Sequence, residues 1–263
     1  MIAAVIPAQN EEDRIKYVIK SVIAAGVDKI YVIVNGSSDK TLDEVNLVDD
    51  KRINIILFKE SLGIDVPRAI GAFEAYKNGA KVIVFVDGDM IGNISPIIRK
   101  LISSVIKQNI DLSLTNCYPK MPNTHGLGAL IIKFRLMLNK TLDIESQIGV
   151  STPSHGPHAV SRKLLEIVPF KEIAMPPVAL ALAVKANIKV NVSTTIPHHK
   201  LGSKTKTFQH GRKIAETIIG DCLEAICVFR GEKRNRIYNG YKYEGYNNER
   251  KIDILEEYIS KID

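Results

Sequence analysis

The sequence predicts an α/β protein in which one doubly wound, mostly parallel sheet is followed by a helical C-terminal extension. Short runs rich in β-branched residues recur at steady spacing, and they are mostly apolar on both faces, as in strands covered by helices on both sides. Amphipathic helical patterns alternate with these runs, which is typical of repeated strand–helix units. GxGxxG and GxxxxGK[ST] motifs are absent from the sequence, which disfavours dinucleotide-binding dehydrogenases and P-loop NTPases.

The expected elements follow from local periodicity. Ile15, Val18, Ile19, Val22 and Ile23 repeat at the spacing of one buried helix face, and Ser95 can cap a helix that has Pro96 at its first position. The expected strands are residues 2–6, 30–34, 53–57, 82–86, 112–114 and 189–192. The expected later helices are residues 129–142, 161–167, 178–186, 208–229 and 252–262. Residues 148–157 are rich in Ser, Gly and Pro and are expected to form a loop.

The chain has 263 residues and a formal net charge of +7, and its lysine excess grows after residue 199. A basic balance suits phosphate-bearing substrates, nucleic acid or an anionic membrane, and a merely solvated surface is the alternative. The cysteines form no CxxC pair, so we expect reduced thiols. The apolar stretches are too short to span a bilayer, and acidic residues follow the N-terminal run at once. We therefore expect a soluble, cytoplasmic protein, and leave peripheral contact with a membrane open.

Polar clusters directly follow three of the predicted strands. Residues 7–12 follow the first strand, residues 35–41 follow the second, and Asp87-Gly88-Asp89 follows the fourth. Ligands of wound sheets bind beyond the carboxyl ends of the strands. The three clusters are therefore expected to meet at one edge of the sheet.

The Asp87-Gly88-Asp89 triplet is a candidate metal site. Two carboxylates two residues apart can face one cation if the chain turns between them, and Gly88 permits such a turn. Mg²⁺ or Mn²⁺ held there would neutralise charge on a departing diphosphate. A solvated turn is the alternative for the triplet. Asn10 and Glu11, or Ser38 and Asp39, could likewise serve only as helix caps.

The three clusters, in this order and spacing, resemble those of family 2-type glycosyltransferases with the GT-A fold, best over residues 1–120. The resemblance implies a UDP- or GDP-sugar donor and bound Mg²⁺ or Mn²⁺. It also implies that the first loop lines the base and ribose, that Asp39 contacts the base, and that Asp87 and Asp89 meet the ribose, diphosphate and metal. The residues expected to bind the nucleotide sugar are Pro7, Ala8, Asn10, Glu11, Asn35, Ser37, Asp39, Arg68, Asp87 and Gly88.

Some positions depart from this family pattern. Asn35 stands where the family usually has Asp, which weakens a charged contact to the base. Arg68 lies in a segment resembling the one before the family's metal motif, so it is a candidate to pair with the diphosphate. A surface arginine is the alternative. The region that usually supplies the general base of inverting members, residues 170–189, has no carboxylate after Glu172, which favours retention of configuration.

Residues 154–162 resemble the small-residue loop of retaining glucosyl-3-phosphoglycerate and mannosylglycerate-type synthases. His155, Gly156 and Pro157 would then border the sugar and the acceptor. By the same resemblance, His198 or His199 would complete the metal shell of Asp87 and Asp89, and a structural histidine is the alternative. Lys204, with Lys206, could hold the diphosphate or an anionic acceptor in a closing loop and so take part in catalysis, and a solvated loop is the alternative.

We therefore expect a metal-dependent glycosyltransferase whose acceptor is a small molecule or lipid-linked, anionic or a lipid phosphate. Residues 1–205 would form the nucleotide-sugar-binding catalytic domain, with the helical extension 206–263 packed on it. A non-catalytic binding protein of this fold and a sugar-phosphate nucleotidyltransferase remain as alternatives. We expect no nucleic-acid partner. Residues 236–246 could mediate a homodimer or pack on the chain's own core.

Overall fold

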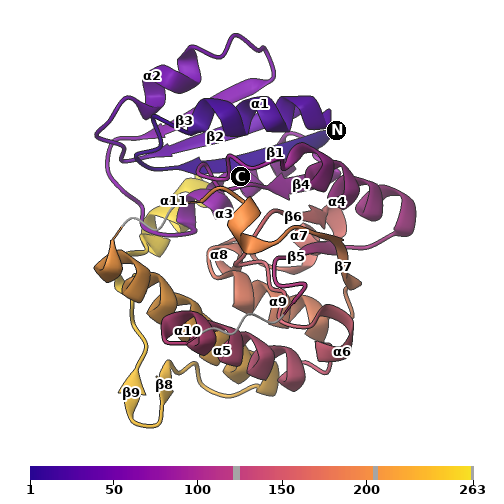
Figure 1. Cartoon of the computed structure of the whole chain (residues 1–263), viewed down its shortest axis with the longest axis vertical. Helices are drawn as coiled ribbons and strands as arrows, with labels where there is room; N and C mark the ends of the chain where they lie inside the picture. The colour runs from indigo at the N-terminus through magenta and orange to yellow at the C-terminus, as the bar shows by residue number, and fades with distance from the viewer. Residues whose placement is uncertain (121–124, 204–206, 262–263) are drawn as a thin grey trace.

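The computed structural model describes residues 1–120, 125–203 and 207–261 (Figure 1). Its centre is a seven-stranded sheet in the order β3-β2-β1-β4-β6-β5-β7. Strand β6 runs antiparallel to β4 and β5, and the other neighbouring pairs are parallel. The predicted α/β class with a mostly parallel sheet is thus confirmed. The strands are β1 Ile2–Ala8, β2 Lys29–Asn35, β3 Ile53–Phe58, β4 Val82–Phe85, β5 Leu112–Asn116, β6 His158–Ser161 and β7 Val190–Thr195.

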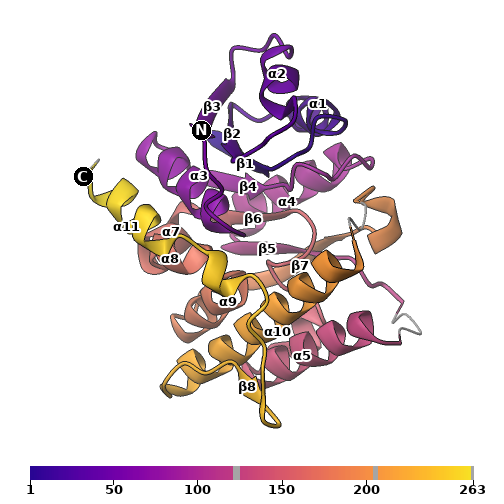
Figure 2. The ribbon, with the colours of Figure 1, turned by 90° about the vertical axis from the view of Figure 1, so that its left-hand side faces the viewer.

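Helices cover both faces of this sheet (Figure 2). Helices α1 and α4 pack on one face, and α3 and α9 pack on the other. Ala3, Ala4, Val5 and Ile6 of β1 are all fully buried because successive side chains point to opposite, equally covered faces. The helices are α1 Ile15–Ala25, α2 Thr41–Asn46, α3 Val66–Lys77, α4 Ser95–Gln108, α5 Leu127–Thr141, α6 Glu145–Ile148, α7 Arg162–Ile167, α8 Phe170–Ile173, α9 Pro176–Lys185, α10 Phe208–Arg230 and α11 Ile252–Ser260.

The helical segment after residue 206, called the C-terminal extension here, packs back on the rest of the chain. Helix α10 lies against α5 and α9, and α11 lies against α3 and α8 (Figure 2). Between them, β8 (Ile237–Tyr238) and β9 (Tyr241–Lys242) form a hairpin, which the short helix η2 (Asn247–Glu249) follows. Tyr238 and Tyr243 pack against Phe134 of α5, with ring centroids 5.0 and 5.6 Å away. These two tyrosines therefore pack on the chain's own core. None of the helices in the described ranges is long and apolar enough to cross a membrane.

Strand β6 was not predicted from the sequence, since it begins just after the expected loop 148–157 and ends at the first residue of the expected helix 161–167. The strand has four residues and pairs with β4 and β5, which are distant in sequence, so no local pattern marks it. His158 stacks on Phe85 of β4 at a centroid distance of 4.9 Å. The helix expected next is present, and the Ser161 hydroxyl caps it by accepting a hydrogen bond from the Leu164 amide.

His158 should make folding sensitive to acid. Burial, assisted by the positive charge of Arg68, lowers the pKa of His158 to about 3. Its ordinary value is about 6.5, so below that pH the unfolded chain binds a proton that the folded chain does not. Stability from this group is full above pH ~6.5 and falls toward pH ~3, by at most about 1.4 kcal/mol per pH unit.

Urea denaturation at a series of pH values, with wild type compared with His158→Gln, measures this effect. The free energy of unfolding of the wild type should fall more steeply with acidification than that of the variant. Parallel slopes would contradict the assignment.

Candidate active site

The loops at the carboxyl edge of the sheet border a cavity of about 770 Å³, whose far wall is helix α10. Three polar clusters predicted to converge all contribute to its lining. The predicted site residues that line it are Pro7, Ala8, Asn10, Glu11, Asn35, Arg68, Asp87, Asp89, His155 and His198. Other predicted residues in the described ranges lie outside the lining: Ser37, Asp39, Gly88, Gly156, Pro157 and His199. Lys204 and Lys206 fall outside the described residues.

The loops after β1 and β2 are tied to each other by hydrogen bonds. The Asn10 amide donates to the Ser37 hydroxyl at 3.1 Å, and the Ser38 amide donates to the Asn10 side-chain oxygen at 2.9 Å. Asn10 adopts a φ of 56°, a left-handed conformation that Asn tolerates better than most residues. Ser37 therefore holds the first loop in place through a hydrogen bond to Asn10, although it does not itself line the cavity.

Asp39 also joins these two loops. Its carboxylate accepts hydrogen bonds from the Thr41 amide at 3.0 Å, at the start of α2, and from the Glu12 amide at 3.1 Å. Burial opposes ionisation, but hydrogen bonds from Thr41 and Glu12 outweigh it and lower the pKa of Asp39. The Asp39 carboxylate thus accepts a hydrogen bond at the start of α2, close to the capping alternative, and it lies outside the cavity lining.

The hydrogen bonds of Asn35 explain why this chain has an amide where an acidic residue is usual. Its side-chain oxygen accepts a hydrogen bond from the Leu62 amide at 2.7 Å, and its side-chain NH₂ donates to the Gly63 carbonyl at 3.3 Å. A carboxylate could accept the first bond but could not donate the second. Asn35 is 4% exposed. It therefore fixes the loop between β3 and α3.

The Asp87-Gly88-Asp89 turn is packed closely against the end of β1. The Gly88 amide donates to the Pro7 carbonyl at 3.1 Å, and a β-carbon on Gly88 would lie 3.0 Å from that same oxygen. Gly88 therefore serves close approach of the two strand ends. Asp87 and Asp89 both line the cavity.

Arg68 is buried, so the alternative of a surface arginine is wrong. It is 7% exposed, and its Nη2 lies 2.6 Å from an Asp87 oxygen. Its Nη1 lies 3.1 Å from an oxygen of Asp65, the residue that precedes α3. Two carboxylates thus hold the guanidinium, and one of them belongs to the candidate metal motif.

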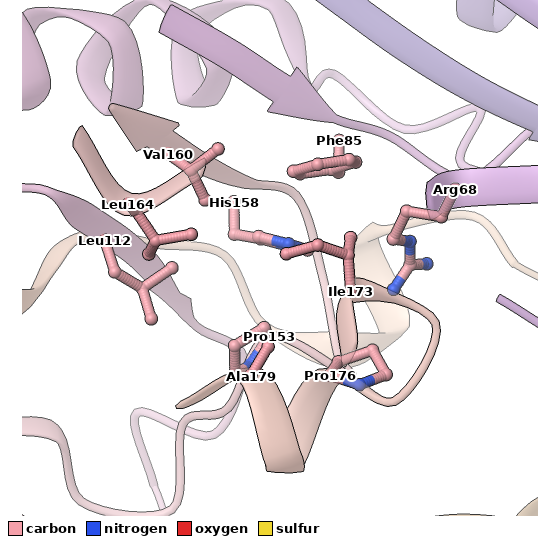
Figure 3. Close-up of a pocket in the computed structure, with 10 residues that line it drawn as sticks. All are labelled: Arg68, Phe85, Leu112, Pro153, His158, Val160, Leu164, Ile173, Pro176 and Ala179. Atoms are coloured by element: carbon pink, nitrogen blue, oxygen red, sulfur yellow. The ribbon is translucent and has the colours of Figure 1, made fainter. Parts of the chain in front are cut away.

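A second, small cavity of about 20 Å³ lies behind Arg68, with room for about one water molecule (Figure 3). Figure 3 shows His158 beneath the ring of Phe85, and apolar side chains of β5, α7 and α9 close the space. Within the described ranges, Arg68 Nε and His158 Nδ1 are buried without a hydrogen-bond partner. This cavity lies on the core side of the arginine.

A cluster of aromatic and imidazole rings borders the cavity beyond β5. His155 Nε2 and His198 Nδ1 are 3.2 Å apart, and Tyr118 stacks on His155 at 5.3 Å. Burial, with the nearby charge of Arg135, lowers the pKa of His155 well below 6.5 and lowers that of His198. Both rings are therefore neutral at pH 7, the form that can ligate a metal. His199 is exposed.

The expected metal shell of Asp87, Asp89 and one histidine is not assembled among the described residues alone. Across residues 1–120, 125–203 and 207–261, no group of three or more His, Cys, Asp or Glu side chains is placed to hold a metal. Asp89 and His198 nevertheless line the same cavity. A metal there would need further ligands from a bound substrate.

Sequence reasoning missed the wall that α10 contributes. Ile214 and Ile218 of α10 line the cavity together with His210 and Tyr246. His210 Nδ1 lies 2.7 Å from the Tyr246 hydroxyl. The two residues are far apart in the sequence, and no motif links them.

Glu172, the last carboxylate before α9, is not among the residues that line the cavity. It is 5% exposed, and one of its oxygens accepts a hydrogen bond from Arg234 Nη2 at 2.6 Å. Helix α9 itself contains no acidic residue. Helix α9, in the region where a general base was expected for an inverting enzyme, therefore supplies no carboxylate to the cavity.

Comparison with known proteins agrees with this geometry. Residues 3–167 match the family model described as glycosyl transferase family 2. None of the curated proteins compared with the chain matches it.

Solved structures with the same fold include glucosyl-3-phosphoglycerate synthase from Mycobacterium tuberculosis. Its complex with UDP is 18% identical, with a TM-score of 0.64, over 90% of this chain and 82% of that chain. Its complex with Mn²⁺, UDP-glucose and phosphoglyceric acid is 17% identical, with a TM-score of 0.65 and the same coverage. Similarity at this level establishes the shared GT-A fold. Because the family model spans more than half of the chain, this protein belongs to glycosyl transferase family 2 and is a glycosyltransferase.

Proposed function

We propose that the protein transfers a sugar from a UDP- or GDP-sugar to an acceptor in a reaction that depends on Mn²⁺ or Mg²⁺. The observation that carries the proposal is the convergence of Asp87 and Asp89 with the first-strand loop and Asn35 around one cavity. The similar solved structures are complexes with UDP, or with Mn²⁺ and UDP-glucose, which supports the same donor chemistry here.

In this proposal the base and ribose lie against the loop that contains Pro7, Ala8, Asn10 and Glu11. That loop is already held in place by Ser37, Ser38 and Asp39, so little ordering is needed when the nucleotide binds. Arg68 is engaged by two carboxylates. Its proposed role is therefore to orient Asp87 toward the ribose and diphosphate.

The side chains available as ligands fit a divalent metal. Asp89 offers a hard carboxylate oxygen, and His198 or His155 offers a neutral imidazole, a combination that suits Mn²⁺ better than Mg²⁺. A metal bound there would stabilise negative charge on the departing diphosphate. Asp89 and a histidine leave coordination positions for diphosphate oxygens. His199 lies outside the lining, whereas His198 lines the cavity, so His198 is the stronger candidate of the pair.

We propose that the acceptor enters between the sheet loops and the wall formed by α10. His155 lines this cavity, and Gly156 and Pro157 follow it in the chain. The net charge of +7 favours an anionic acceptor, either a small phosphorylated molecule or a lipid phosphate. Arg68 is the one Lys or Arg among the described lining residues. Lys204 and Lys206 would therefore supply the cations that bind the acceptor or the diphosphate.

Removing the Asp89 carboxylate should weaken metal-dependent nucleotide binding. The affinity of Asp89→Ala for UDP or GDP in the presence of Mn²⁺ should fall by about 100-fold, because even indirect partners of a metal cost about 10–100-fold. Isothermal titration calorimetry with and without Mn²⁺ measures the loss. Asp49→Ala, which removes an exposed carboxylate after α2, is the control and should bind like the wild type. Unchanged binding by Asp89→Ala would rule out the proposed metal site.

Restoring an acidic residue at position 35 should harm this chain. Asn35→Asp loses the hydrogen bond to the Gly63 carbonyl and buries a charge, so it should cost about 1–3 kcal/mol of stability and weaken nucleotide binding. Asn54→Asp is matched, because Asn54 also donates from its side chain to a backbone carbonyl, that of Arg52, but lies outside the cavity lining. Equal nucleotide affinities for the two variants would contradict a role for Asn35 in the site.

The absence of a carboxylate on α9 leads us to propose transfer with retention of configuration. Nuclear magnetic resonance of the first product formed should show the same anomeric configuration as in the donor. An inverted product would contradict the proposal and would require a general base elsewhere.

A further inference from the structure

A row of alternating acidic and basic side chains connects the cavity with the C-terminal extension. In spatial order the members of this charge row are Asp87, Arg68, Asp65, Arg250, Asp221, Arg236 and Glu224. The first three belong to the sheet loops and α3, and the last four belong to the extension. The step from Asp65 to Arg250 is the point at which the two parts meet.

Asp65 divides its two oxygens between these parts. One oxygen lies 3.1 Å from Arg68 Nη1, and the other lies 3.5 Å from Arg250 Nη2. Arg68 in turn uses Nη2 to hold Asp87 at 2.6 Å. Asp65 therefore sets where the Arg68 guanidinium lies, and Arg68 sets where Asp87 points.

Arg250 is held firmly on its other side. Its side chain is 1% exposed, and it donates hydrogen bonds to both oxygens of Asp221 at 2.8 and 2.7 Å. Such two-point contacts fix the plane of a guanidinium. A charge this deeply buried needs its partners, because removing them leaves an uncompensated ion out of water.

The backbone reinforces the same contact. The Lys251 amide donates to the Leu62 carbonyl at 2.9 Å, and Arg250 Nε donates to the Ile64 carbonyl at 3.4 Å. A β-carbon on Gly63 would lie 2.3 Å from the Glu249 carbonyl oxygen, so the two segments touch directly. Asp65 adopts a φ of 61°, an unfavourable conformation that needs support from its surroundings. Residues 249–251 thus brace the loop that presents Asp65.

We propose that Arg250 is a positioning residue of the donor site, acting through Asp65 and Arg68 on Asp87. The assignment rests on the proposed function of the cavity. Without Arg250, Asp65 keeps one cationic partner, and Arg68 can turn both of its terminal nitrogens toward it. Asp87 then loses the contact that orients it beside Asp89. The C-terminal extension is on this account part of the donor site.

Arg236 offers a matched control within the same row. It is also buried and also binds Asp221, at 2.8 Å, together with Glu224 at 3.0 Å. Its other hydrogen bonds reach the carbonyls of Thr217 and Tyr243, which also belong to the extension. Loss of Arg236 should therefore disturb the extension, whereas loss of Arg250 should also disturb the donor loops.

The first experiment measures hydrogen exchange in Arg250→Met and Arg236→Met without any ligand. In Arg250→Met, exchange should rise in residues 62–68 and 86–89 as well as in the extension. In Arg236→Met, the rise should be confined to residues 217–246. Identical exchange maps for the two variants would overturn the proposal. This readout does not depend on what the cavity binds.

The second experiment measures the affinity for UDP and GDP with Mn²⁺. Arg250→Met should bind about tenfold more weakly than the wild type, and Arg236→Met should bind nearly as well as the wild type. Arg250→Lys should restore part of the loss, because an ammonium can still meet one of the two carboxylates. If the wild type binds neither nucleotide, the proposed function fails, and hydrogen exchange still decides whether Arg250 controls the loops.

Asp65→Asn covers the case in which Arg250→Met does not fold. Asn tolerates the left-handed backbone but removes the charge that joins the two arginines. Its loss of affinity should be at least as large as that of Arg250→Lys, and Asp65→Asn combined with Arg250→Lys should be no worse than the more affected single variant. Additive losses would show that the two residues act independently and would overturn the proposal.

Discussion

The burial of Arg68 is the constraint around which the site is arranged. Carboxylates stabilise a guanidinium that is only 7% exposed, and here Asp65 and Asp87 meet it from two sides. The pairing also limits what each group can do. Asp87 is oriented by the arginine, so the two acidic residues of the candidate metal motif differ in environment although they stand two positions apart.

The fold places this arginine between two cavities. It lies in the first turn of α3, with the small apolar cavity on its core side and the large cavity on its open side. The loops after β1, β2 and β4 approach from the sheet, and the backbone contact between Gly88 and Pro7 sets the separation of two of them. A parallel sheet makes this convergence unavoidable, because its strands all end at one edge.

The C-terminal extension completes the cavity as well as covering the core. Helix α10 buries one side against α5 and α9 and presents His210, Ile214 and Ile218 to the cavity. Residues 249–251 then return to the loop after β3. We propose that residues 1–205 and 206–263 are better regarded as two contributors to one site than as a catalytic domain with an appendage.

The sequence by itself determined which segments are covered parallel strands and where their functional ends lie. Runs that are apolar on both faces identify such strands, and the polar clusters that follow at once mark their carboxyl ends. Asp87, Asp89 and Arg68 could be singled out for the same reason, since their chemistry is visible in a few adjacent residues. Tertiary structure alone decided the antiparallel strand β6, the pairing of His155 with His198, and the contact of Asp65 with Arg250. It also decided the role of Asn35, whose side chain forms hydrogen bonds with two backbone groups of a later loop. These features join segments that are distant in the chain, and a local pattern contains no information about which distant partner a side chain will meet.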